Sequence, residues 1–387
     1  MVYDLISIVA GALLVLTWVA YPLLVACFRG SRRVWTRENR RRVTALVAAW
    51  DAGKEISQRV RNLAEQTYPA ELLRIYVASD GSTDDTVSEA WKAAPGRVTA
   101  KQFPRGGKSA TQTEAMVEIS GEIIVISDAD TDFAPDCVEQ LLAPFADPKV
   151  GCVTGTMVSR DASRPLSKDQ GLYWRFENWL RLCESDAGIL ITCAGACMAF
   201  RRELFIPLAP TQGDDCMIPL DIALQGYRIV HAPLAVAYDT FPSTLGGELL
   251  ARMRMTTRNL SGFFARPVLL NPFRYPGYAL SLWLHKVFRW MTPFFALALC
   301  LSSMAAPRPH LLVLLPQLAF LLLALVGGLF AMRGRKAPRI AAAAFSFMAV
   351  NAGFALGVLR WLGGRKITTY TNIRDTIPPA SPNEGRS

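Results

Sequence analysis

Long apolar segments lie at both ends of the chain. Residues 1–28 are almost wholly apolar after the first few positions, and a helix needs about 20 such residues to cross a bilayer. Three more apolar runs follow near the C-terminus, at Val287–Ala305, Leu311–Met332 and Ile340–Leu362. The pattern predicts one N-terminal transmembrane helix and two to three C-terminal ones within residues 287–363.

Basic residues flank these runs and predict their orientation. Arg29, Arg32, Arg33, Arg37, Arg40, Arg41 and Arg42 follow the first run, and Arg333, Arg335 and Lys336 follow Met332. Positive residues stay on the cytoplasmic side, so we expect a multi-pass protein of the cell membrane whose middle part is cytoplasmic. The last run ends near Arg360 and Arg365, which conflicts with a full crossing. A complete span and a re-entrant or interfacial segment both stay open.

The middle of the chain, 42–260, alternates short apolar runs with amphipathic stretches. The predicted strands are Val43–Ala49, Leu72–Ser79, Arg97–Phe103 and Glu122–Ser127. The predicted helices between and after them are Lys54–Glu65, Asp84–Lys92 and Lys108–Ile119. This alternation is typical of a mostly parallel α/β sheet that is covered by helices.

Two further segments complete the expected organisation. Residues 261–286 carry aromatic side chains among basic ones, which favours an interfacial segment at the membrane surface. Residues 375–387 are rich in proline and polar residues, which predicts a disordered tail.

Composition supports a membrane protein and narrows its partners. Hydrophobic residues make up 51% of the chain and charged ones 19%, with a net charge of +10. Nucleic acid is one partner for a basic protein, but an arginine cluster beside an apolar run is explained more simply by lipid headgroups. We therefore expect a lipid bilayer as partner and no nucleic acid. The eight cysteines include no CxxC pair, so a zinc site is not expected.

Acidic residues follow three of the predicted strands. Asp51, Asp80 and the pair Asp128 and Asp130 each come directly after an apolar run. Ligands of open α/β sheets bind at the carboxyl ends of strands. Helix capping is the alternative explanation, and it suits Asp84 or Asp85. It does not explain two like charges beside a wholly apolar strand, which favour a divalent cation bound with substrate phosphates.

Other polar segments have two explanations each. Gly107-Lys108-Ser109 is not the end of a P-loop, because Gln102 stands where that loop needs glycine. Lys108 or Arg105 at a helix start suits a diphosphate, and the alternative is a solvated basic turn. Asp214 and Asp215 precede an amphipathic stretch, where a helix cap is the alternative. For the basic stretch around Arg254, a solvated or lipid-facing surface is as good an explanation as a functional site.

The ordered set of motifs resembles glycosyltransferase family 2, the inverting GT-A family that contains the cellulose, hyaluronan and poly-N-acetylglucosamine synthases. The motifs are Ala48-Ala49-Trp50-Asp51, Asp80-Gly81-Ser82-Thr83-Asp84-Asp85-Thr86, Gly107-Lys108, Asp128-Ala129-Asp130, Phe200-Arg201-Arg202, Asp214-Asp215 and Gly226-Tyr227-Arg228. Leu284-His285-Lys286-Val287-Phe288-Arg289-Trp290 resembles the SHK-x-x-RW segment of bacterial exopolysaccharide transferases. The resemblance covers about Arg42 to Pro293 and implies a GT-A catalytic domain with a Rossmann-like sheet.

The resemblance implies a role for each matching residue. Those that would bind the nucleotide sugar are Ala49, Trp50, Asp51, Asp80, Lys108, Asp128 and Arg254. Asp128 and Asp130 match the DxD motif that holds Mg²⁺ or Mn²⁺. Asp215 matches the catalytic base, and Asp214 matches the acid before it.

The chain departs from the family pattern at several positions. Ala52 stands where the first motif usually has glutamate, and Ser79 replaces the first aspartate of the common Asp-Asp-Gly. Processive synthases carry Gln-x-x-Arg-Trp, whereas the aligned positions here begin with Ala251 and end with Met255. The missing tryptophan, which lies under the acceptor sugar in those synthases, weakens the case for a processive polymerase.

The expected function is inverting transfer of a hexosyl or N-acetylhexosaminyl group from a nucleotide sugar, with UDP the expected nucleotide. The acceptor is expected to be membrane-associated or a growing polysaccharide of the cell envelope. Single-sugar transfer to a polyprenyl-phosphate or other lipid-linked acceptor is the alternative. A non-catalytic scaffold is less consistent with the full set of acids.

Overall fold

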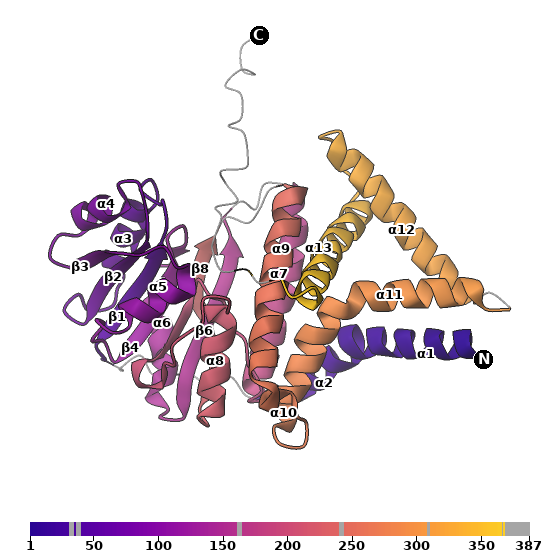
Figure 1. The fold of residues 1–387 in the computed structure, drawn as a ribbon, viewed down its shortest axis with the longest axis horizontal. Helices are drawn as coiled ribbons and strands as arrows, with labels where there is room; N and C mark the ends of the chain where they lie inside the picture. The colour runs from indigo at the N-terminus through magenta and orange to yellow at the C-terminus, as the bar shows by residue number, and fades with distance from the viewer. Residues whose placement is uncertain are drawn as a thin grey trace, which may run out of the picture.

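The structure is a computed structural model that describes residues 1–30, 35, 40–160, 165–239, 244–307, 310–365 and 367. The predicted tail at 375–387 and part of the arginine cluster lie outside the described residues. A mixed sheet forms one end of the molecule and long apolar helices form the other, with helices α7 (Pro165–Asp186) and α9 (Leu245–Ala265) between them (Figure 1).

One eight-stranded sheet has the order β3-β2-β1-β4-β7-β6-β8-β5. Its first half is parallel and consists of β1 (Val43–Ala49), β2 (Leu73–Asp80), β3 (Val98–Phe103) and β4 (Ile123–Asp128). These strands confirm the four that were predicted, within one residue at each end. β4 is rich in β-branched residues, which suits a strand between two neighbours, and its first five residues are buried.

The second half of the sheet brings antiparallel pairs. β7 (Met198–Arg201) is antiparallel to both β4 and β6 (Val150–Ser159), while β6 is parallel to β8 (Arg228–Asp239). The short β5 (Asp132–Phe133) pairs antiparallel with β8. The prediction of a mostly parallel sheet is therefore confirmed for the half that carries the acidic strand ends.

Helices connect the strands and cover the sheet. In the first half these are α3 (Ile56–Ala64), α4 (Thr86–Ala93), α5 (Lys108–Ala115) and α6 (Cys137–Leu142), followed by the 3-10 turn η2 (Ala143–Ala146). In the second half they are α7 (Pro165–Asp186), the 3-10 turn η3 (Arg202–Leu204), α8 (Asp214–Leu224) and α9 (Leu245–Ala265). Apolar side chains from strands and helices form one buried cluster on each side of the parallel strands.

Among the described residues, four helical segments are long and apolar enough to cross a membrane. The first consists of α1 (Val2–Val15), the π-helical turn η1 (Leu16–Ala20) and α2 (Tyr21–Cys27). The second consists of α10 (Pro276–Leu280), the π-helical η5 (Ser281–Val287) and α11 (Phe288–Ala305). The third and fourth are α12 (Leu311–Met332) and α13 (Arg339–Leu362). One N-terminal and three C-terminal candidate spans agree with the predicted arrangement.

The segment predicted to be interfacial is divided between two elements. α9 continues to Ala265 with Phe263 buried, and a 3-10 turn η4 (Pro267–Leu270) connects it to the span that begins at Pro276. That span starts earlier than the predicted Val287. Its first turns contain His285 and Lys286, which lower the hydropathy, but both side chains are paired with Glu177.

α13 packs against two different partners along its length. Near its start, Ala341 lies against Gly327 of α12. Near its end, Gly353 and Gly357 allow close approach to Arg252 and Thr256 of α9, since a Cβ at either glycine would lie 2.6 Å from those side chains. The second half of α13 is therefore packed on a helix that adjoins the sheet part of the molecule, and not only on the other apolar helices.

Candidate active site

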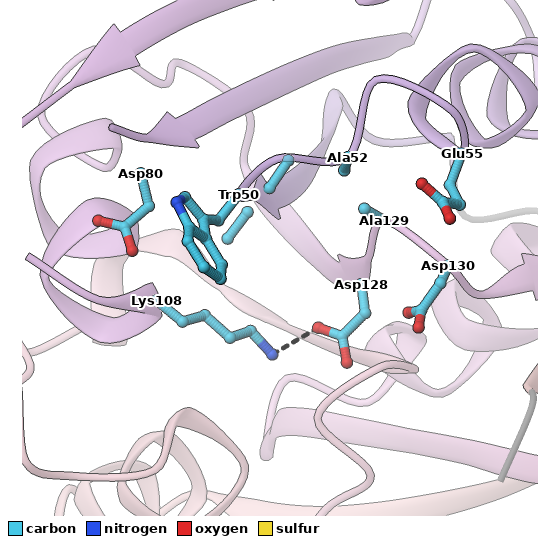
Figure 2. A pocket seen from close by; sticks show the side chains of 10 residues that line it. Trp50, Ala52, Glu55, Asp80, Lys108, Asp128, Ala129 and Asp130 are labelled. Atoms are coloured by element: carbon cyan, nitrogen blue, oxygen red, sulfur yellow. Dashed lines mark ion pairs between the residues drawn. The ribbon is translucent and has the colours of Figure 1, made fainter. Parts of the chain in front are cut away.

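A cleft that is open to solvent, with an interior of about 100 Å³, lies at the carboxyl ends of β1, β2 and β4. Its lining residues come from the ends of these strands, from the turn after β1 and from the start of α5. They are Ala48, Ala49, Trp50, Ala52, Glu55, Asp80, Lys108, Asp128, Ala129 and Asp130. Figure 2 shows that Trp50 and Asp80 lie on one side of the cleft and Glu55 and Asp130 on the other.

Asp80 organises the turn between β3 and α5. Its Oδ1 accepts hydrogen bonds from the backbone N–H groups of Gly106 and Gly107 at 2.7 and 2.9 Å and from Thr111 Oγ1 at 3.0 Å. Its Oδ2 lies 2.7 Å from Arg105 Nη1. The guanidinium of Arg105 is in turn 3.7 Å from the centre of the Trp50 ring. The Asp80 side chain thus fixes the arginine that forms a cation–π contact with Trp50.

Gly81 is required by this arrangement. Its φ of +66° is in the left-handed region, which glycine adopts without strain. A Cβ at this position would also lie 2.9 Å from Cβ of Arg105. The turn after β2 therefore has room for Arg105 only because residue 81 has no side chain.

Asp51 connects two strand ends and does not line the cleft. Its Oδ1 accepts a hydrogen bond of 2.7 Å from the backbone N–H of Thr83, and its own N–H donates to Ser82 Oγ at 3.1 Å. Its φ of +44° is also in the left-handed region, where aspartate is tolerated better than most residues. Asp51 therefore stabilises the turns next to the predicted nucleoside-binding residues and does not itself contact the cleft.

Lys108 joins the two acidic motifs. Its Nζ lies 2.6 Å from Asp128 Oδ1 and 2.9 Å from Asp214 Oδ2. Gln112 Nε2 also donates to Asp214 Oδ2, at 3.0 Å. Burial alone would lower the pKa of Lys108, but the charges of Asp128 and Asp214 outweigh it and raise that pKa. Lys108 is therefore a fixed cation between the end of β4 and the start of α8.

Asp214 and Asp215 have opposite electrostatic environments at the start of α8. Burial would raise the pKa of Asp214, but Lys108 outweighs it and holds that pKa below its usual value. Burial and the neighbouring negative charge of Asp214 both raise the pKa of Asp215. Neighbouring carboxyls whose pKa values are pushed apart are typical of acid–base sites.

Asp215 lines a second, smaller cavity, with an interior of about 40 Å³, between the α/β part and the apolar helices. Glu177 and Arg181 of α7, Arg252 of α9 and Lys286 of η5 line it as well. Lys286 Nζ and Arg289 Nη1 each lie 2.7 Å from Glu177. Burial would raise the pKa of Glu177, but these cations hold it well below its usual value.

A buried histidine ties this cavity to the N-terminal span. His285 Nδ1 lies 2.7 Å from Glu184 Oε1, and its Nε2 lies 3.2 Å from Glu177 Oε2. Glu184 also accepts hydrogen bonds from Ser281 and from Tyr21 of α2. The SHK-x-x-RW-like segment is thus fixed by two glutamates of α7, one of which also contacts the first span.

The predicted site residues fall into four groups. Ala49, Trp50, Asp80, Lys108, Asp128 and Asp130 line the first cleft, and Asp215 lines the second cavity. Asp51 and Asp214 line neither space: Asp51 hydrogen-bonds to the turn after β2, and Asp214 pairs with Lys108. Arg254 is not among the residues described as lining either space. It precedes Arg258 by one helical turn, and the guanidinium of Arg258 donates to Ser109 Oγ at 3.0 Å.

Glu55 is the lining residue that sequence reasoning missed. It lies in the turn after β1, three residues beyond the position where the family motif has its glutamate. Arg105 was expected at the diphosphate together with Lys108, and Arg258 was part of the basic stretch around Arg254. Their positions against Trp50 and Ser109 arise from contacts that are distant in sequence.

The comparison with solved structures identifies the class of protein. The chain is similar to the mannosyltransferase PcManGT from Pyrobaculum calidifontis, solved in complex with GDP-Man and Mn²⁺, with a TM-score of 0.68 and 25% identity. The match covers 93% of this chain and 99% of that one, so it includes apolar helices as well as the sheet. The fold is therefore that of a GT-A transferase with C-terminal apolar helices.

The family follows from the sequence. The profile described as "Glycosyltransferase like family 2" matches residues 40–259, more than half of the chain. The protein belongs to this family.

Curated relatives match over the same region. An N-acetylglucosaminyltransferase of Rhizobium leguminosarum bv. viciae is 30% identical over 238 residues, which are 57% of this chain and 56% of that protein. The poly-beta-1,6-N-acetyl-D-glucosamine synthase of Staphylococcus aureus (strain COL) is 28% identical over 222 residues, 55% of this chain and 53% of that protein. The matched part thus spans about half the length of these relatives.

Proposed function

We propose that the protein is an inverting glycosyltransferase that moves a sugar from a nucleotide-diphosphate sugar to a membrane-associated acceptor in exopolysaccharide or cell-envelope glycan synthesis. One observation carries the proposal: Lys108 joins Asp128 in the first cleft to Asp214 beside Asp215. A donor in the first cleft and an acceptor in the second cavity would meet at this junction. The catalytic part would face the cytoplasm.

The first cleft is suited to the nucleotide diphosphate. Trp50 supplies an aromatic ring and Asp80 a carboxylate on one side, where the nucleoside would lie. The diphosphate would lie beside Lys108 and the two acids Asp128 and Asp130, and Arg254, which lines neither space, would approach it from α9. Such cations stabilise the negative charge that develops on the leaving diphosphate.

Asp128 and Asp130 fit a Mg²⁺ or Mn²⁺ ion. Hard divalent cations prefer carboxylate oxygens together with substrate phosphates. Among the described residues, no group of three or more His, Cys, Asp or Glu side chains is placed to hold a metal, so substrate oxygens would complete the coordination. When bound, the ion would neutralise phosphate charge and orient the diphosphate.

Asp215 is the proposed general base. Its raised pKa makes it a better proton acceptor than an ordinary aspartate. Its carboxylate would remove the proton of an acceptor hydroxyl as the oxygen attacks the anomeric carbon opposite the leaving diphosphate. The configuration at that carbon would invert in one step, without a covalent enzyme intermediate.

The donor sugar is the part of the proposal that needs direct measurement. The names of the curated relatives favour an N-acetylhexosaminyl group, whereas the structural neighbour was solved with GDP-Man. We propose a UDP-sugar. Detergent-solubilised protein would be incubated with radiolabelled UDP- and GDP-sugars and Mn²⁺, and nucleotide release would be measured. Release from none of them would contradict the proposal.

Replacing Asp215 with Asn tests the base separately. This variant should lose transfer while it binds the nucleotide sugar as tightly as the parent protein. Near-normal turnover by Asp215→Asn would exclude this residue as the base.

Addition of a single sugar to a lipid-linked acceptor is the second candidate. The replacement of the processive motif's tryptophan by Met255 favours it. Gel sizing of the radiolabelled product separates the two, because a processive enzyme makes a ladder and a single transfer adds one sugar.

A further inference from the structure

A chain of buried hydrogen bonds connects the first two candidate spans to the second cavity. Its centre is Glu184 of α7, where three polar side chains converge on the single oxygen Oε1: Tyr21 of α2, Ser281 and His285. The other ring nitrogen of His285 lies 3.2 Å from Glu177. The side chains of Glu184 and His285 are fully buried, and Glu177 lines the second cavity. The chain thus runs from the first span to the space that contains the proposed base.

His285 is a cation in this chain. Each of its ring nitrogens faces a carboxylate oxygen, and a neutral imidazole has only one N–H group to donate. Both contacts are therefore hydrogen bonds only when both nitrogens carry a proton. Glu177 is also paired with Lys286, Arg289 and Arg181, at 2.7, 2.7 and 3.3 Å. The orientation of Glu177 is thus set jointly by the imidazolium and by three further cations.

Both spans depart from α-helical geometry where they reach this chain. The π-helical turn η1 ends at Ala20, directly before Tyr21. The π-helical η5 contains Ser281, His285 and Lys286. Such turns are rare in helices and are frequent at functional sites. The backbone of each span is therefore irregular at the residues that contact α7.

Anchoring of the spans does not by itself require these charges. Moving ionic groups out of water costs several kcal/mol each, and apolar side chains of similar volume often hold buried elements together at least as well. Elsewhere the same two spans are joined without charge, where Ser7 Oγ lies 2.7 Å from Ser302 Oγ. The ionic chain is concentrated where the spans meet α7, beside the second cavity. This position indicates a role in the reaction.

Arg181 connects the chain to Asp215. It pairs with Glu177, and both Arg181 and Asp215 line the second cavity. Burial raises the pKa of Asp215, and charged groups of four helices shift this pKa further: Asp214 raises it, and Lys108, Arg258 and Arg181 lower it. Glu177 and Asp215 therefore compete for the positive charge of Arg181. When His285 compensates part of the charge of Glu177, Arg181 stabilises the Asp215 carboxylate more strongly.

We propose that Tyr21 and His285 are positioning residues of the transfer reaction. They act through the two glutamates of α7 on the surroundings of Asp215, and they contact neither donor nor acceptor. This inference rests on the proposed function and makes the first candidate span a part of the active site. Without the contacts of Tyr21 and His285, Glu177 would attract Arg181 more strongly and the ionised base would be less stable.

Tyr21→Phe tests the chain at the end that lies in the first span, because it removes one hydroxyl and keeps the ring. Purified full-length protein in detergent would receive Mn²⁺ and the UDP-sugar on which the parent protein is most active, and nucleotide release would be measured. We expect kcat to fall about threefold to tenfold, as for the loss of one hydrogen bond, with an unchanged KM for the UDP-sugar. The acidic limb of the pH profile should move to higher pH, because the base must be ionised and its pKa rises.

Two further variants extend the test along the chain. Glu184→Gln shows whether Tyr21 acts through Glu184, since Tyr21→Phe should have little further effect in that background, whereas independent residues give additive losses. His285→Gln keeps polar groups at the centre of the chain but removes the charge. It should move the acidic limb further in the same direction.

Ser7→Ala is the matched control. It also removes one hydroxyl between the first two spans, at the pair with Ser302 and outside the lining of both spaces. It should change neither kcat nor the acidic limb.

The outcomes separate this inference from the proposed function. An active parent protein whose Tyr21→Phe variant keeps its kcat or its acidic limb would overturn the inference alone. Additive losses in the double variant with Glu184→Gln would also overturn it, as would a rise in the KM for the UDP-sugar that matches the fall in kcat. No nucleotide release by the parent protein from any donor would instead contradict the proposed function.

Discussion

The ammonium nitrogen of Lys108 lies 2.6 Å from a carboxylate oxygen of Asp128, and the same nitrogen lies 2.9 Å from Asp214. Replacing Lys108 with Met would leave the buried Asp214 without this cation and would remove a positive charge from the cleft. Breaking a buried pair costs about 3–5 kcal/mol, and one charge-assisted contact changes ligand affinity by about tenfold or more. We expect a lower unfolding temperature and weaker nucleotide binding.

Thermal unfolding and titration with the nucleoside diphosphate would measure these two effects of Lys108→Met. Lys101→Met is a suitable control, because Lys101 pairs with Glu118 near the surface. A Lys108 variant as stable as this control, with unchanged affinity, would contradict the role of Lys108.

The pH dependence of transfer should report Asp215. The base must be ionised, so kcat/KM should fall as the pH drops through a pKa that lies above the ordinary value for aspartate. Asp214→Asn removes a negative neighbour, so the pKa of Asp215 should fall and the acidic limb should move to lower pH. Glu71→Gln, at an exposed position, should leave the limb in place. A shift to higher pH in Asp214→Asn would refute the electrostatic coupling.

A pair of glycine substitutions separates backbone strain from close contact. Gly81→Ala and Gly96→Ala both place a side chain at positive φ, +66° and +76°, which costs about 1–2 kcal/mol. A Cβ at Gly96 meets nothing within 4 Å, whereas one at Gly81 meets Arg105 at 2.9 Å. We expect Gly81→Ala to be the more destabilising and to be the only one of the two that weakens nucleotide binding. Unfolding temperatures and nucleotide affinities of both variants would check this.

Removing Asp128 should separate metal-dependent from metal-independent binding. In the parent protein, Mn²⁺ should tighten binding of the nucleotide sugar, because the ion neutralises phosphate charge. Asp128→Ala should abolish most of that gain, whereas Asp136→Ala, with its carboxylate near Gln140, should keep it. Calorimetry with and without Mn²⁺ measures the difference. An equal gain in Asp128→Ala would exclude Asp128 as a ligand.

The parallel half of the fold was predictable because its signals are local. Each strand there is a short apolar run, and the acids that follow it lie at one edge once the strands are parallel. Asp80, Asp128 and Asp130 were found in this way. Glu55 was not, because the sequence pattern placed it inside the helix predicted at Lys54–Glu65, whereas it lies in the turn before α3, which begins at Ile56.

The second cavity depends on contacts between distant parts of the chain. Glu177, Arg252 and Lys286 belong to three helices that the sequence does not place together. The start of the second candidate span was predicted too late, because Lys286 and His285 lower the hydropathy there. The glutamates that pair with these two side chains lie elsewhere in the sequence and do not enter a hydropathy pattern. Arg254 was carried over from the family motif, and its role as a diphosphate clamp stays a prediction.

The close packing of α13 on α9 affects how the protein can be divided. Gly353 and Gly357 bring α13 against Arg252 and Thr256 of α9. A chain shortened before residue 339 would therefore lose the helix that covers one face of α9, which lines the second cavity. A soluble fragment designed on the family boundary at 259 would end inside α9. The smallest unit that keeps both spaces intact thus includes the C-terminal candidate spans, and we expect its purification to need detergent or nanodiscs.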